Sequence, residues 1–509
     1  MLVNRKRIAK NTIILYTRQI LVMLVGLYTS RVILQNLGVD DYGIYGVVGG
    51  IVGFMGFLNG VLATSSSRFL TYALGEGDAD KTEKTFSTTL TLHIMLGFII
   101  LAIGEAIGPW TIENKLNIPA ERLQAAQWAY QFSLLTMAVG VSQVPYSAVI
   151  VSHEKMDLYA YMAIVDILLR LGIATSLFYW GGDKLIFFAA LLLLQSVGIM
   201  MFYRFYCAIK FKEAVFKLRI EKSLFRQIAS FSGWNFVYQF VYSLNAQGTT
   251  ILMGVFFCPA IVAAKTISVK VNQMTTQFIG TFRQAMNPQI VKLYAAGETN
   301  EFKKLTLQSG LYSFFIMWIM TLPICLLAPQ LLGYWLKEVP AQADYFCILI
   351  MIDSLFWLFD CSFNQGLVAT GDIKANAIYS GILNFLRFPI IYIIYKLGGE
   401  AVWAFYISII FGAIIGCVLK PWLLIRQCHF VWGDFFSVYW QCAKVVLISV
   451  IVPLGVNQYI PQQSFIHFML IGALSVLSAI IIIYWVGLDN VTRKKINSII
   501  KQKMYKSTN

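Results

Sequence analysis

The chain has 509 residues, of which 58% are hydrophobic and only 13% are charged, and its mean hydropathy is +0.68. Soluble domains carry about one quarter charged residues, so this composition excludes a chain that folds mainly in water. The chain is therefore expected to fold within a membrane.

Apolar runs recur along the whole chain, and at about twenty residues each can cross the roughly 30 Å hydrocarbon core of a bilayer. We predict an all-α membrane protein with about fourteen transmembrane helices. The first span contains Arg18 and is longer than a signal-peptide core, so we expect no cleaved leader. The predicted spans are 11–34, 42–63, 87–108, 124–150, 158–180, 184–203, 229–256, 261–286, 305–328, 344–369, 376–397, 401–423, 437–459 and 464–487.

The second span carries a glycine stripe, in the segment DDYGIYGVVGGIVGFMGFLNG. Steps of three and four residues place these glycines on one helix face: Gly43, Gly46, Gly49, Gly53, Gly56 and Gly60. In water each would cost roughly 0.5–1 kcal/mol relative to alanine. In lipid the backbone has no water to bond, so the segment stays helical. The bare face predicts close approach of a neighbouring helix, either as static packing or as a surface that slides.

A short motif occurs twice. Residues 72–81 and 294–303 both read YAxGEx[DN]xxK, and Ser152-His-Glu-Lys155 is echoed more loosely by Thr370-Gly-Asp372. Each pair follows equivalent spans, which predicts two six-span lobes related by an axis along the membrane normal, around a central cavity suited to alternating access. The predicted organisation is an N-lobe (1–203), a basic amphipathic linker (204–228), a C-lobe (229–425), two extra spans (426–488) and a basic tail (489–509).

The distribution of lysine and arginine predicts the orientation. Basic residues gather in segments 5–10, 68–84, 204–226 and 493–506, which all lie on one side of the predicted membrane. The opposite side holds only Lys115, Arg122, Lys184, Lys337 and Lys396. The positive-inside rule then places both termini in the cytoplasm. The net charge of +15 follows from this bias and from attraction to lipid headgroups, so it does not indicate a nucleic-acid partner.

Charged residues inside spans cost on the order of 2.5–3.5 kcal/mol each at the bilayer centre, so the deep ones need partners or water. Four cations lie near span ends, where their side chains are expected to reach the interface: Arg31, Lys265, Arg283 and Lys444. Arg18, Lys270 and Arg387 lie deeper, and we predict that they line a cationic cavity and contact an anionic cargo.

Acidic and amide side chains complete the predicted cavity. Asp353, Asp360 and Asp166 either couple the movement of H⁺ or Na⁺ or act as counter-ions, and Asp166 is four residues from Arg170 on one helix. The predicted polar lining comprises Asn235, Gln239, Asn245, Gln273 and Gln277.

Motifs for enzymatic chemistry do not occur. The sequence has no P-loop, its four histidines show no metal-ligand spacing, and its predicted outer loops are short. We therefore predict a protein that is not an enzyme, with no catalytic residues, no cofactor and no metal site.

Two segments carry a resemblance to a known family. Residues 31–45, RVILQNLGVDDYGIY, resemble the junction of the first two spans of bacterial polysaccharide flippases, and residues 67–78, SRFLTYALGEGD, are similar to their following loop. The resemblance implies a Wzx-type O-antigen or capsule flippase of the multidrug/oligosaccharidyl-lipid/polysaccharide (MOP) exporter superfamily. Such a protein moves an undecaprenyl-pyrophosphate-linked oligosaccharide across the bacterial inner membrane.

The resemblance also implies partners. These are a lipid-linked anionic oligosaccharide, membrane lipids and H⁺ or Na⁺ as a coupling ion, for a monomeric transporter that works beside glycosyltransferases and a polymerase. Three alternatives stay open: a cation-coupled multidrug exporter, a lipid II flippase of peptidoglycan synthesis, and an oligosaccharide polymerase or ligase.

Overall fold

The computed structural model of the chain describes residues 5–76, 78–153, 155–214, 221–226, 240–241, 243–372, 374–459, 465–490, 492–494 and 497–498. Within these ranges every regular element is a helix and no residue forms a strand. Ten of the described helical segments are long and apolar enough to cross a membrane, so the chain is a multi-pass membrane protein.

The helices follow the predicted spans closely. Spans 1 and 2 share α1, and the first part of span 7, including Asn235 and Gln239, lies outside the described residues. The described α-helices are α1 (Arg5–Glu76), α2 (Ala79–Asn114), α3 (Leu123–Ser152), α4 (Met156–Ser176), α5 (Lys184–Lys210), α7 (Thr249–Phe256), α8 (Pro259–Ala295), α9 (Thr299–Trp335), α10 (Ala343–Thr370), α11 (Lys374–Lys396), α12 (Trp403–Ala413), α13 (Lys420–Cys428), α14 (Trp432–Tyr459) and α15 (Phe465–Ile482). A short 3₁₀ turn (Ala120–Arg122) and three π-helical turns (Leu244–Gly248, Ile414–Leu419 and Ile483–Gly487) connect or extend them.

Local sequence explains where several helices begin and end. α1 breaks at Gly38, whose φ of 80° lies in the left-handed region that glycine enters without steric cost. This break separates the predicted first and second spans. Asp78 and Asp183 cap α2 and α5, because each carboxylate accepts hydrogen bonds from the first free backbone N–H groups of its helix.

The repeated motifs occupy equivalent places in the chain. The first copy of YAxGEx[DN]xxK covers the turn from α1 to α2, and the second covers the turn from α8 to α9. The looser pair, Ser152-His-Glu-Lys155 and Thr370-Gly-Asp372, also lies at helix ends, since Ser152 ends α3 and Thr370 ends α10. Sequence similarity and position among the helices therefore agree.

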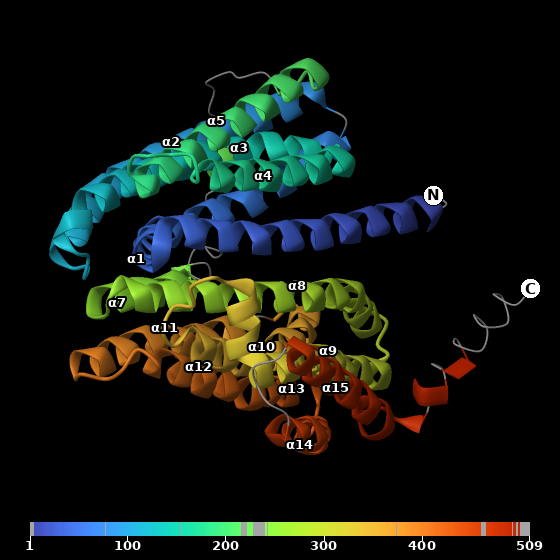
Figure 1. Cartoon of the computed structure of the whole chain (residues 1–509). Coiled ribbons are helices and arrows are strands. Elements are labelled where there is room, and N and C mark those ends of the chain that lie inside the picture. The colour runs from blue at the N-terminus through green and yellow to red at the C-terminus, as the bar shows by residue number, and fades with distance from the viewer. Residues whose placement is uncertain are drawn as a thin grey trace, which may run out of the picture. The chain divides into compact units, whose positions relative to one another are not determined.

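The chain divides into two compact units. Unit 1 comprises 1–266, 336–341 and 388–401, and unit 2 comprises 267–335, 342–387 and 402–509. In unit 1, α3 packs against α1, α2 and α5, as Figure 1 shows. In unit 2, α9 packs against α10, α14 and α15. The predicted lobes 1–203 and 229–425, the linker 204–228, the extra spans 426–488 and the tail 489–509 stay a prediction.

The glycine stripe of the second span packs within unit 1. A Cβ at Gly43 would lie 1.9 Å from the carbonyl oxygen of Pro259, and one at Gly46 would lie 2.7 Å from Oγ1 of Thr266. Gly49 meets nothing within 4 Å. The prediction of close helix approach is thus confirmed at Gly43 and Gly46, where a side chain would displace α8, but it does not extend to Gly49.

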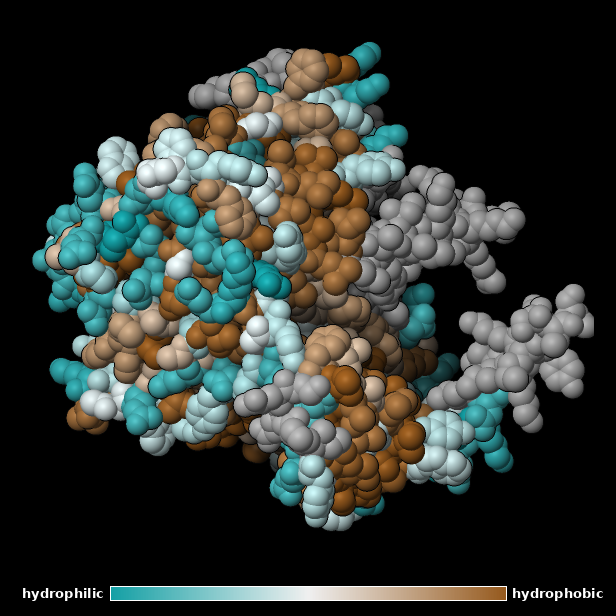
Figure 2. All heavy atoms as spheres, in the orientation of Figure 1, coloured by the Kyte–Doolittle hydropathy of each residue, from teal (hydrophilic) through white to brown (hydrophobic). Residues whose placement is uncertain are grey.

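Large apolar side chains remain exposed along the helices, as expected for surfaces that face lipid rather than water. Examples are Phe98 on α2, Leu194 on α5 and Ile451 on α14, each more than 60% exposed. Figure 2 shows apolar residues gathered in broad brown areas on one face of the molecule.

Candidate functional site

The most fully described polar site is a buried cluster in unit 2, built around Lys420. The side chain of Lys420 is 3% exposed. Its Nζ lies 3.1 Å from Oδ1 of Asp360 and donates hydrogen bonds to Oδ1 of Asn364 at 3.1 Å and to Oδ1 of Asn376 at 2.5 Å. We call Asp360, Asn364, Asn376 and Lys420 the Lys420 cluster.

Helical spacing brings the members of this cluster together. Asp360 and Asn364 lie four residues apart on one face of α10, and Asn376 is in the first turn of α11. Lys420 begins α13 directly after the π-helical turn 414–419, which adds a residue to the helix turn and re-aims the side chains that follow. The amides also bind one another, since Nδ2 of Asn376 donates to Oδ1 of Asn364 at 2.7 Å.

Sequence reasoning missed Lys420 as a site residue, although it lies near the end of the predicted span 401–423, because it was counted among the basic residues of the cytoplasmic side. The structure shows that its ammonium is buried and bonded to acceptors on α10 and α11. The available signal was the acidic and amide stripe Asp360–Asn364, which is left without a cation unless a distant residue supplies one.

Arg387 and Asp353, both predicted site residues, lie against the same glycine of α12. A Cβ at Gly412 would be 3.1 Å from Oδ1 of Asp353 and 3.9 Å from a terminal nitrogen of Arg387. Arg387 interacts electrostatically with Asp353 and with Asp360, and its Nε is buried with no hydrogen-bond partner among the described residues. Arg387 is therefore part of the same charged region of unit 2 as the Lys420 cluster.

Residues of α8 contribute a second face in unit 2. Lys270 is half-buried, and Gln273 and Gln277 are exposed on the same helix. Arg283 was expected to extend to the membrane interface, but its guanidinium donates a 2.8 Å hydrogen bond to the carbonyl oxygen of Cys361 and lies over the ring of Trp357. That expectation is wrong because Arg283 finds neutral acceptors inside unit 2.

Unit 1 holds a different kind of charged pair. Nε of Arg170 lies 3.2 Å from Oδ2 of Asp166 on α4, with side chains 51% and 37% exposed. Nε2 of Gln195 on α5 donates to Oδ1 of Asp166 at 2.8 Å. Arg170 also acts electrostatically on Tyr45 of α1. We call Asp166 and Arg170 the α4 pair.

Two further predicted features of unit 1 have described positions. Lys265 was expected to reach the interface, but it is 7% exposed and its Nζ donates to Oγ1 of Thr250 at 2.9 Å, so that expectation is wrong. Asn245 is half-buried and its side-chain amide donates to the carbonyl oxygen of Val241. Arg18 lies in α1, and its side chain is outside the described residues.

Outside the spans, one arginine joins three segments of unit 1. Arg122 donates to both carboxylate oxygens of Asp41 at 2.8 and 2.6 Å, and its Nη1 lies 2.6 Å from Oδ2 of Asp183. Burial opposes ionisation of Asp183, but the bonds from Arg122 and from backbone N–H groups outweigh it and hold its pKa below the ordinary value. We call these three residues the Arg122 clamp.

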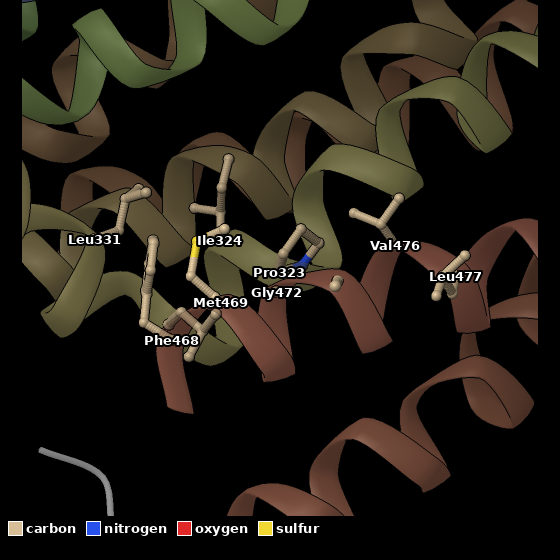
Figure 3. Close-up of a pocket in the computed structure, with 10 residues that line it drawn as sticks. Pro323, Ile324, Leu331, Phe468, Met469, Gly472, Val476 and Leu477 are labelled. Carbon is tan, nitrogen blue, oxygen red and sulfur yellow. The ribbon is translucent and has the colours of Figure 1, made fainter. Parts of the chain in front are cut away.

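An apolar cavity of about 590 Å³ lies between α9 and α15 in unit 2 (Figure 3). Its lining residues are Pro323, Ile324, Leu327, Leu331, Phe468, Met469, Gly472, Ala473, Val476 and Leu477. None of these side chains is charged or can donate a hydrogen bond, so the cavity does not suit a charged headgroup.

No protein-family model matches the sequence, and no curated protein matches it. Solved structures do match. The lipid II flippase MurJ, in an inward closed conformation, aligns with 94% of this chain and 99% of its own at 15% identity and a TM-score of 0.70. An inward-facing multidrug resistance MATE family transporter of the MOP superfamily aligns with 81% of this chain and 94% of its own, at 15% identity and a TM-score of 0.62.

The chain has the MOP-transporter fold. A third match, a MOP-superfamily transporter from Pyrococcus furiosus, aligns at 16% identity over 83% of this chain and 97% of its own, with a TM-score of 0.56. That structure is described as having a binding pocket of reversed polarity, which suggests a different function for it.

Proposed function

We propose that this protein is a flippase that moves an undecaprenyl-pyrophosphate-linked oligosaccharide across the bacterial inner membrane by alternating access, for synthesis of O-antigen or capsule. The observation that carries the proposal is an excess of cations inside the spans of a chain with the MOP fold. Leaving aside charges in the first or last two positions of a predicted span, the described cations there are Arg31, Arg170, Lys265, Lys270, Arg283, Arg387, Lys420 and Lys444, against the acids Glu105, Asp166, Asp353 and Asp360.

The chemistry of this excess favours an anionic cargo. A pyrophosphate carries negative charge on several oxygens, and guanidinium groups bind such oxygens in pairs. Arg283 bonds to a neutral backbone carbonyl oxygen, so its charge is not cancelled by the contacts described above. A carrier of cationic drugs would instead concentrate acids in its spans.

Arg170 is added to the predicted cargo contacts Arg18, Lys270 and Arg387. Its described ion pair uses Nε alone, and half of its side chain is exposed within the predicted span 158–180. An exposed guanidinium in acyl chains is costly, so we propose that this face of α4 borders water and receives an anionic headgroup. Asp353, Asp360 and Asp166 act in this proposal as counter-ions.

A lipid II flippase is the second candidate, since the similar fold of MurJ favours it and its cargo also carries a pyrophosphate. A cation-coupled multidrug exporter is supported by the MATE fold but opposed by the excess of cations in the spans.

Deletion of the gene in its own bacterium distinguishes these candidates. We expect loss of surface polysaccharide and accumulation of its lipid-linked oligosaccharide on the cytoplasmic leaflet, measured by extraction and mass spectrometry of lipid-linked intermediates. Accumulation of lipid II would instead identify the second candidate. Increased sensitivity to cationic drugs with normal polysaccharide would contradict the proposal.

Charge-reversing variants test the residues. Arg18→Glu, Lys270→Glu, Arg387→Glu and Arg170→Glu should each abolish surface polysaccharide while membrane levels of the protein stay unchanged, because a carboxylate repels the headgroup. Lys115→Glu is the matched control, since Lys115 is exposed beside Trp110 at the end of α2. Normal polysaccharide in all four variants would reject cationic recognition.

A further inference from the structure

The Lys420 cluster has the composition of a site for a monovalent cation. One carboxylate oxygen and two amide oxygens lie around a single positively charged nitrogen, which belongs to an almost fully buried lysine side chain. Hard metal cations such as Na⁺ prefer carboxylate and carbonyl oxygens of this kind. Here the atom at the centre is the Nζ of Lys420.

We infer that Lys420 is a tethered cation, whose ammonium occupies an oxygen site on α10 and α11 that binds Na⁺ when the lysine side chain is removed. The inference does not depend on which cargo is carried. It assigns Asp360 as the counter-ion of a permanent internal charge, so wild-type protein has no need of Na⁺ at this position.

The charge of the ligand set selects the ion. Asp360 supplies one negative charge and the two asparagines supply none, which balances a monovalent cation. Arg387 acts electrostatically on Asp360, and Arg283 bonds to the backbone of the adjacent residue Cys361. These two guanidinium groups add positive charge nearby and therefore disfavour a divalent ion.

The oxygens are held in place without the lysine. Nδ2 of Asn376 donates to Oδ1 of Asn364, and Oγ of Ser380 donates to Oδ1 of Asn376 at 3.1 Å. These bonds fix the amide oxygens toward one point, so truncation of Lys420 leaves a prearranged set of acceptors rather than loose side chains.

The test measures thermal unfolding of the purified full-length protein in NaCl and in choline chloride of equal ionic strength. Lys420→Ala should lower the Tm in choline chloride, and Na⁺ should restore most of the loss in a saturable way. The double variant Lys420→Ala with Asp360→Asn should show no restoration, because the charged ligand is gone. Lys420→Met should also show none, since its side chain fills the space.

Lys444→Ala is the matched control, because Lys444 lies in the same unit but is exposed over the ring of Trp440. It should respond alike to both salts. A Lys420→Ala variant that Na⁺ stabilises no more than this control would overturn the inference. A parallel test compares the wild type with Asp360→Asn: saturable stabilisation of the wild type by Na⁺ that disappears in Asp360→Asn would show that a metal ion, not Lys420, occupies the site, and would overturn the inference.

Discussion

The α4 pair and the Lys420 cluster place the same chemistry, an acid with a basic partner within a predicted span, in opposite surroundings. Arg170 and Asp166 are 51% and 37% exposed and belong to one helix, whereas Lys420 is 3% exposed and joins residues of three helices. A charge that is fully enclosed by its own chain has no room for a cargo, so it serves structure. A charge that stays exposed is available to bind.

Neutralising the acid of each site should give the largest difference in unfolding free energy between the two sites. Asp360→Asn leaves the Lys420 ammonium buried without a carboxylate, which should destabilise the protein by about 3–5 kcal/mol. Asp166→Asn removes a partly exposed pair and should cost less than about 1 kcal/mol. Thermal and denaturant unfolding in detergent measure both. Equal losses would show that exposure does not separate the two sites.

The Arg122 clamp tests an intermediate case, a charge network at helix ends that is only partly exposed. Arg122→Gln should cost roughly 2–3 kcal/mol at neutral pH, because it removes hydrogen bonds between charged groups.

The pH dependence of the clamp follows from the lowered pKa of Asp183. A lowered folded-state pKa contributes stability that is complete above the ordinary value of 3.8 and is lost as pH falls below it. Because Arg122 bonds the carboxylate forms of both Asp183 and Asp41, the difference in Tm between wild type and Arg122→Gln should stay constant above about pH 5 and shrink as pH falls from about 5 to about 3. A constant difference would contradict the role of Asp183.

The glycine stripe should show the smallest difference in stability, between a glycine packed against another helix and one that faces open space. Gly43→Ala meets the Pro259 carbonyl and should destabilise by about 1–3 kcal/mol, whereas Gly49→Ala meets open space and should be neutral or stabilise by about 0.5–1 kcal/mol. Unfolding of the two variants side by side gives the answer. A destabilised Gly49→Ala protein would mean that the open face closes on another helix during function.

The sequence by itself determined the membrane class, the boundary between the first two spans within residues 35–41 and the equivalent turns of the repeat. These depend on local properties, because an apolar run of sufficient length must be helical in lipid wherever its neighbours lie. The roles of several predicted site residues stay untested. Arg18, Asn235 and Gln239 have no described side chain, and the roles of Lys270, Gln273 and Gln277 stay predictions.

Tertiary structure alone decided which charges are enclosed. Lys265 and Arg283 were assigned by their distance from span ends and Lys420 was missed as a site residue, yet each is bonded to acceptors on other helices or turns. The position of a charged residue along its helix can be read from the sequence. The acceptor that stabilises its buried charge, however, lies 15 to 78 positions away in the chain. Only packing brings such residues within hydrogen-bonding distance, so the fate of each charge is a property of the folded chain.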